Sequence, residues 1–193
     1  MNFYRFPPAH PRRLFCAVIA FVAVVLALPT IVQAALADSS ADIEQVTLAE
    51  PSQDWEIDVP DLYCERDYES LASIGWTCGD VSVQATLTED AKDDATTLRR
   101  MVRALAMAPL PADAPTFDGT NGALLLTDAP SSTAALSLDG TGEDENKDWV
   151  VTVTGKGDQA RATTSRIWHA FGQEDLPAAA DAEFADFSGE LMY

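Results

Sequence analysis

Short runs in which apolar and polar residues alternate recur through the middle of the chain. This period of two is typical of half-buried β-strands, whose successive side chains point to opposite faces of a sheet. In the clearest run, residues 81–87, every second side chain is apolar. The pair Gly79-Asp80 precedes this run and predicts a tight hairpin turn. The predicted strands occupy residues 55–60, 74–78, 81–87, 123–127, 133–138 and 148–154.

Two other segments repeat apolar residues at helical spacing. The first begins at Thr88, an N-cap candidate followed by several acids, and it ends before Pro109. The second covers residues 158–171, and Gly172 is its natural C-terminal stop. The pattern therefore predicts two amphipathic helices among the strands.

A longer apolar run lies near the N-terminus. Arg12 and Arg13 precede an uncharged stretch over residues 14–28, and small residues follow Pro29. A basic head, a short apolar core and a small-residue end are the three parts of a bacterial signal peptide. An uncleaved membrane anchor is the alternative, because residues 14–37 are numerous enough to cross a bilayer. Either reading places the domain that follows outside the cytoplasmic membrane.

The cleavage site of this segment follows from its small residues. Ala35 and Ala37 fit the A-x-A pattern, which makes Asp38 the first residue after cleavage. Cleavage after Ala34 is a second candidate. A twin-arginine export route is a further alternative, although no lysine follows the arginine pair.

These patterns divide the chain into four parts. We expect a signal peptide or anchor over residues 1–37, a flexible acidic spacer over residues 38–54, and an extracytoplasmic domain over residues 55–172. Residues 173–193 form an acidic tail. Consecutive strands with short connections favour an antiparallel sheet. The expected fold class is α+β, with a sheet of about five strands and two packed helices, preceded by an N-terminal export helix.

The order of elements resembles the PsbP/Mog1-like fold, which some small extracytoplasmic actinobacterial proteins adopt. The resemblance spans residues 55–171 and rests on this order, on the Trp55-Glu-Ile-Asp-Val-Pro60 strand and on the Gly75-Trp76 strand. It brings no functional residue with it. What it implies is a binding or assembly module and not an enzyme.

The charge of the chain limits its partners. The chain holds 31 acidic residues against 12 Lys and Arg, and its formal net charge is −19. Such a surface repels nucleic acid and anionic lipid, so we expect no nucleic acid partner and membrane contact only through an uncleaved N-terminal segment. A lineage-wide acidic composition explains this charge more simply than a dedicated cation-binding role.

Two cysteines, Cys64 and Cys78, follow the export segment. An even count in an oxidising compartment predicts a structural disulfide, which should stabilise the fold by about 3 kcal/mol. A metal pair or a redox dithiol is the alternative. The spacing is not C-x-x-C, however, and His169 is the single histidine in this part of the chain.

The sequence holds no recognisable catalytic motif, phosphate loop or zinc-ligand set. Asp144, Asn146 and Asp148 match the start of an EF-hand loop, but Trp149 replaces the required glycine and Gly155 replaces the bidentate glutamate. A solvated hairpin tip is therefore favoured over weak adventitious calcium binding. We expect no cofactor and no metal.

The tail repeats apolar residues at helical spacing, at Phe184, Phe187 and Leu191, and Tyr193 ends the chain. Spaced aromatics in an acidic background can form an amphipathic helix that docks in a partner's groove. The alternative, which is slightly favoured, is that these aromatics fold back onto their own sheet.

Together these patterns predict a non-catalytic, exported cell-envelope protein. We expect a binding or accessory module for another envelope or membrane protein. The alternatives are an extracytoplasmic hydrolase with a carboxylate-based site, and an acidic binder of cations or cationic peptides.

Overall fold

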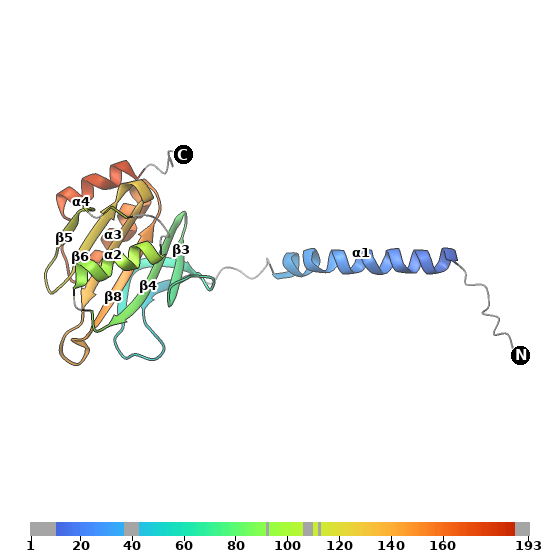
Figure 1. Ribbon diagram of the computed structural model, residues 1–193, viewed down its shortest axis with the longest axis horizontal. Helices are drawn as coiled ribbons and strands as arrows, with labels where there is room; N and C mark the ends of the chain where they lie inside the picture. The colour runs from blue at the N-terminus through green and yellow to red at the C-terminus, as the bar shows by residue number, and fades with distance from the viewer. Residues whose placement is uncertain (1–10, 37–42, 92, 106–109, 112, 188–193) are drawn as a thin grey trace, which may run out of the picture. The chain divides into compact units, whose positions relative to one another are not determined.

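Figure 1 shows the computed structural model, which describes residues 11–36, 43–91, 93–105, 110–111 and 113–187. The chain forms two compact units, Met1–Ala41 and Asp42–Tyr193. The first contains helix α1 (Pro11–Leu36), and most of its described side chains are exposed. In the described part of the chain, no helix combines the length and apolarity needed to cross a membrane. Ala37 and Asp38, which flank the predicted cleavage site, lie outside the described residues.

The second unit is built on one antiparallel sheet of eight strands, in the order β1-β2-β3-β4-β8-β7-β6-β5. The α+β class and the antiparallel sheet are confirmed, whereas the expected numbers of about five strands and two packed helices are wrong, because α4 adds a third α-helix to this unit. The additional strands are the two edges and are short or weakly patterned. The strands are β1 (Ile43–Leu48), β2 (Ile57–Arg66), β3 (Ile74–Cys78), β4 (Val81–Glu89), β5 (Thr116–Asp118), β6 (Leu124–Asp128), β7 (Thr133–Asp139) and β8 (Lys147–Thr154).

Helices cover both faces of the sheet (Figure 1). Helix α2 (Asp94–Leu105) buries Leu98 and Val102 against one face, where Val150 of β8 also points. Helix α3 (Gly157–Ala170) packs on the opposite face with Trp149 and Val151. Each fully buried Leu or Val stabilises the fold by about 1.5–3 kcal/mol, so both helices are held by their apolar stripes. The remaining helical elements are α4 (Ala178–Glu183), η1 (Ala129–Ser131), η2 (Gly142–Asp144) and η3 (Phe184–Asp186).

Strand β1 lies within the segment that the sequence predicts to be a flexible spacer. Residues 43–48 pair with β2 and bury Val46 and Leu48, so residues 38–54 are not a spacer throughout. Strand β2 also continues past Pro60. The pairing of β1 with β2 shifts register there, and Asp61 adopts φ 58°, a local irregularity that accommodates the exposed proline.

The boundary between β4 and α2 also differs from the prediction. Thr88 does not cap the helix, because β4 continues to Glu89. Asp93 is the N-cap residue of α2 instead, since its carboxylate accepts a hydrogen bond from the backbone N–H of Thr96 at 2.9 Å. This interaction and a hydrogen bond from the Thr96 side chain lower the pKa of Asp93. The β3–β4 hairpin and the stop of α3 at Gly172, with φ 74°, agree with the sequence.

Candidate functional site

The disulfide of the second unit joins β2 to β3. Cys64 and Cys78 are bridged in the structure, as the sequence predicts, and both residues are buried. The bridge lies next to the Glu65–Thr77 backbone pair. It therefore holds the base of the loop over residues 67–73.

Four large apolar side chains are exposed in the described part of the second unit, and all four belong to this end of the sheet. They are Ile43 of β1, Tyr63 of β2, and Tyr68 and Leu71 of the β2–β3 loop, with exposed fractions of 70%, 61%, 84% and 65%. We call them the exposed apolar residues. Ile43 and Tyr63 share one face of the sheet, because Ile43 pairs with Glu65, two residues along β2 from Tyr63.

Acidic side chains surround these residues. Glu44, Glu65 and Glu69 are all exposed. The guanidinium of Arg66 reaches Glu44 at 3.4 Å and lies 4.9 Å from the ring centroid of Trp76. This end of the domain therefore presents several exposed apolar side chains in a negatively charged surrounding.

The aromatic residues of the tail are buried within their own domain, whereas docking to a partner requires them to be exposed. Phe184 and Phe187 are each 1% exposed, and their ring centroids lie 4.7 Å apart in the same core as α3. The burial of both rings in the core of their own domain supports the alternative in which these aromatics fold back onto their own sheet. Leu191 and Tyr193 lie outside the described residues. The backbone N–H of Gly157 also donates to the carbonyl of Phe187 at 3.1 Å.

A second feature is a cluster of three carboxylates between α2 and the sheet, which we call the aspartate cluster. Asp94 comes from the first turn of α2, whereas Asp139 of β7 and Asp148 of β8 are directly paired across the two strands. One carboxylate oxygen from each residue lies within 4.8 Å of the others. Three like charges are therefore brought together by one helix start and one strand pair.

The environment of the aspartate cluster disfavours its charges. Burial, followed by the charges of Asp139 and Asp94, raises the pKa of Asp148 to about 6. Burial and the charge of Asp94 also raise the pKa of Asp139. Gly122 lies against this site with φ 77°, and a Cβ there would stand 2.3 Å from Oδ2 of Asp139. A glycine is needed at this position for its backbone angle and for the close approach of the carboxylate.

The aspartate cluster is not the EF-hand-like loop of the sequence. Asp144 bonds the ammonium of Lys147 at 2.7 Å at the tip of the β7–β8 hairpin, which raises the pKa of Lys147. Asp148 instead belongs with Asp139 and Asp94. No motif predicts this grouping, since its members are separated by up to 54 positions; the one local signal is an aspartate on each side of the hairpin.

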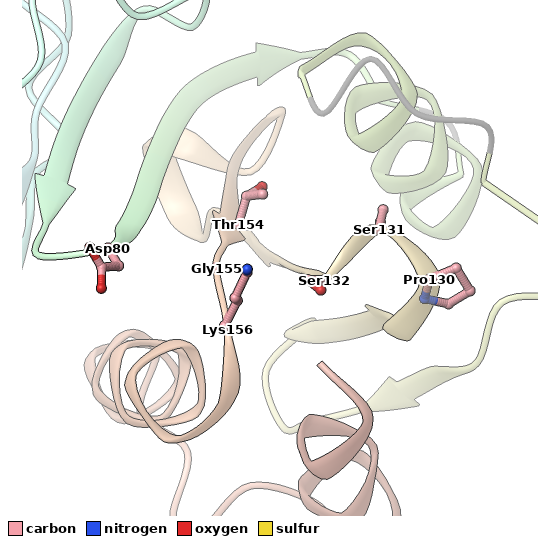
Figure 2. Close-up of a pocket in the computed structure, with 7 residues that line it drawn as sticks. All are labelled: Asp80, Pro130, Ser131, Ser132, Thr154, Gly155 and Lys156. Atoms are coloured by element: carbon pink, nitrogen blue, oxygen red, sulfur yellow. The ribbon is translucent and has the colours of Figure 1, made fainter. Parts of the chain in front are cut away.

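An open pocket of about 540 Å³ lies between the β3–β4 turn, η1 and the start of α3. Figure 2 shows the residues that line it. Lys156 and Asp80 supply its charges, and Ser131 and Ser132 supply hydroxyl groups. Ser131 donates its hydroxyl to the carboxylate of Asp128. None of the three aspartates of the cluster lines this pocket. Its lining residues are Asp80, Pro130, Ser131, Ser132, Thr154, Gly155 and Lys156.

His169 lies away from this pocket, in the last turn of α3, where its Nδ1 is 3.0 Å from the carbonyl oxygen of Gln173.

No family model, curated protein or solved structure matches the chain. The resemblance to PsbP/Mog1-like proteins therefore stays a prediction.

Proposed function

We propose that this chain is an exported, non-catalytic cell-envelope protein whose folded domain binds another envelope or membrane protein. The observation that carries the proposal is the gathering of the exposed apolar residues at one end of the sheet. Isolated apolar side chains are ordinary on protein surfaces, but large exposed ones that all come from adjacent elements are typical of contact surfaces. Tyrosine in particular is enriched at the centres of interfaces.

Export is supported by the disulfide, because such bridges persist in oxidising compartments and are rare in the cytoplasm. The Cys64–Cys78 bridge also holds the ends of the loop that carries Tyr68 and Leu71. A loop with fixed ends loses less conformational entropy on binding than a free one. The same covalent bond therefore supports both the location and the recognition role.

The location of the surface suggests how a partner is recognised. Strand β1 is an edge strand of the sheet, so one side of its backbone is not paired within the sheet. Such an edge can accept a strand from another chain, with neighbouring side chains giving selectivity. The acids around the exposed apolar residues favour a partner surface with a basic rim.

A carboxylate-based hydrolase is the main alternative, and it requires its acids in a substrate pocket. The pocket in Figure 2 is lined by none of the aspartates of the cluster. The binding proposal explains the exposed apolar residues, which the hydrolase proposal does not. It also requires no catalytic role for any buried acid.

The proposal is tested by crosslinking and pull-down of the tagged full chain from the cells that make it. In one variant, Tyr63→Ser is combined with Leu71→Ser. In a matched control, the exposed residues Glu143 and Glu145 of the β7–β8 hairpin are changed to Ser. If each replaced residue contributes about 1 kcal/mol to binding, recovery of specific neighbours falls by roughly tenfold or more in the first variant.

The control retains the wild-type neighbours. Both double variants keep the wild-type melting temperature, because the changed side chains are exposed. Recovery of the same neighbours, at the same yield, by the Tyr63 and Leu71 variant contradicts the proposed surface. Failure of wild-type protein to capture any specific neighbour contradicts the binding role itself.

A further inference from the structure

The three acids of the aspartate cluster form an arrangement that is unfavourable by itself. Carboxylates this close repel one another strongly where water is excluded, and a buried charge requires a partner. In the described part of the chain, no Lys, Arg or His side chain forms an ion pair with any of the three. A cation or a shared proton is therefore needed to balance them.

A second observation concerns hydrogen bonding at the same place. Asp148 is 7% exposed, and its carboxylate has no hydrogen-bond or ion-pair partner among the described residues. Oδ1 of Asp139 is also buried without a partner. Buried polar atoms are nearly always paired, so the unpaired Oδ1 of Asp139 beside the largely buried Asp148 is an oxygen that a cation can bind.

A buried hydroxyl adds to this picture. Ser137 is 1% exposed, and its Oγ lacks a hydrogen-bond partner. It lies two residues before Asp139 on β7 and is paired with Val150, two residues after Asp148 on β8. The hydroxyl therefore belongs to the face of the sheet on which both aspartates lie.

We propose that Asp94, Asp139 and Asp148 bind one calcium ion between α2 and the β7–β8 strand pair. All three donors are carboxylate oxygens, which suit hard cations, and no histidine or thiolate takes part. Two ligands of one ion can be separated by at most twice the metal–oxygen distance. For calcium this limit is about 4.6–5.2 Å, and the three carboxylate oxygens all lie within 4.8 Å of one another, so one calcium ion can reach them.

Magnesium fits less well. It demands near-ideal octahedral geometry and keeps several of its own waters, which a site beside the buried Asp148 does not favour. Because Asp94 and Asp139 are only partly buried, the ion reaches the site from their side.

The ion connects elements that are distant in the sequence. Asp94 begins α2, whereas Asp139 and Asp148 end and begin the two strands of one hairpin. Calcium therefore attaches the first turn of α2 to the sheet and also relieves the repulsion between the carboxylates. Binding to the folded state alone raises stability by mass action.

The test is a calorimetric titration of the purified full chain, freed of metal by a chelator, with CaCl₂ and separately with MgCl₂ at about pH 7.5, where the carboxylates are ionised. Thermal unfolding with and without each ion gives a second readout. The variants are Asp139→Asn and Asp148→Asn. Asp144→Asn is the matched control, because it removes a charge from the nearby hairpin tip, where Asp144 is paired with Lys147.

The proposal predicts one calcium ion per wild-type chain, a higher melting temperature with calcium, and weaker binding of magnesium. Loss of a ligand should weaken calcium binding by at least the roughly tenfold loss typical of changes around a metal site. The control keeps the wild-type affinity and melting response. This site is independent of the proposed protein-binding surface, and neither proposal requires the other.

Three results overturn the site. The first is no saturable calcium binding by the wild type up to about 10 mM, well above the weak range of extracellular modules. The second is unchanged binding in Asp148→Asn. The third is loss of binding in Asp144→Asn, which would assign the ion to the hairpin tip. Tighter binding of magnesium than of calcium contradicts the identity of the ion.

Discussion

Replacing Asp148 by asparagine isolates the cost of its buried charge. Asparagine has nearly the same shape but cannot ionise, so the packing around it is preserved. In the wild type without calcium, burial raises the pKa of Asp148 from 3.8 to about 6. The folded state then holds this proton more tightly than the unfolded state does. This contribution to stability is fully present below the unfolded-state pKa and is lost as the pH rises through about 6.

The size of this stability contribution follows from the pKa shift of Asp148. A difference of about 2 pKa units at 1.36 kcal/mol each corresponds to roughly 3 kcal/mol at neutral pH. In the presence of a chelator, we expect Asp148→Asn to match the wild type within about 1 kcal/mol near pH 4. Near pH 7.5 it should be more stable by about 2–3 kcal/mol.

Urea denaturation at the two pH values measures this difference. Asp144→Asn is again the control, and it should lack the added stability at neutral pH. Calcium should reverse the order, because it stabilises the wild type and not the Asp148 variant. A variant that is less stable than the wild type at neutral pH without calcium would refute the reasoning, since the charge would then be stabilising.

Three further changes test the packing. Replacing Cys64 and Cys78 together by serine should cost about 3 kcal/mol and lower the melting temperature by roughly 6–12 °C; an unchanged melting temperature contradicts the structural role of the bridge. Phe184→Ala should cost about 3–5 kcal/mol in urea denaturation, because the ring lies in the core, and a loss below 1 kcal/mol contradicts that placement. Gly122→Ala should destabilise by about 1–3 kcal/mol, because of its positive φ and the contact with Asp139; wild-type stability in urea would show that the loop adapts freely.

The parts of the fold with strong local patterns could be predicted from the sequence. The β3–β4 hairpin combines alternation with a glycine at the turn, and α3 combines a helical stripe with a glycine stop. The edge strands could not be predicted. Only Val46 and Leu48 of the six residues of β1 are buried, and β5 has three residues. Their pairing depends on neighbours, and a local pattern does not report it.

The sites illustrate the same limit. Helical spacing identified Phe184 and Phe187 as one face, but spacing does not say whether that face meets a partner or the chain's own core. The aspartate cluster depends on the register that pairs Asp139 with Asp148 and on the placement of α2 above them. In a chain with 31 acids, no three of them stand out before the fold is known.

Site-specific photo-crosslinking tests the binding role most directly. A benzoylphenylalanine placed at Tyr68, whose side chain is 84% exposed, replaces one aromatic residue by another and leaves the core intact. The same group at Glu143, on the exposed β7–β8 hairpin, is the control. After irradiation of the cells that make the protein, we expect one dominant crosslinked envelope protein from Tyr68 and none from Glu143. Equal crosslinking from both positions, or none from Tyr68, would contradict the proposed surface.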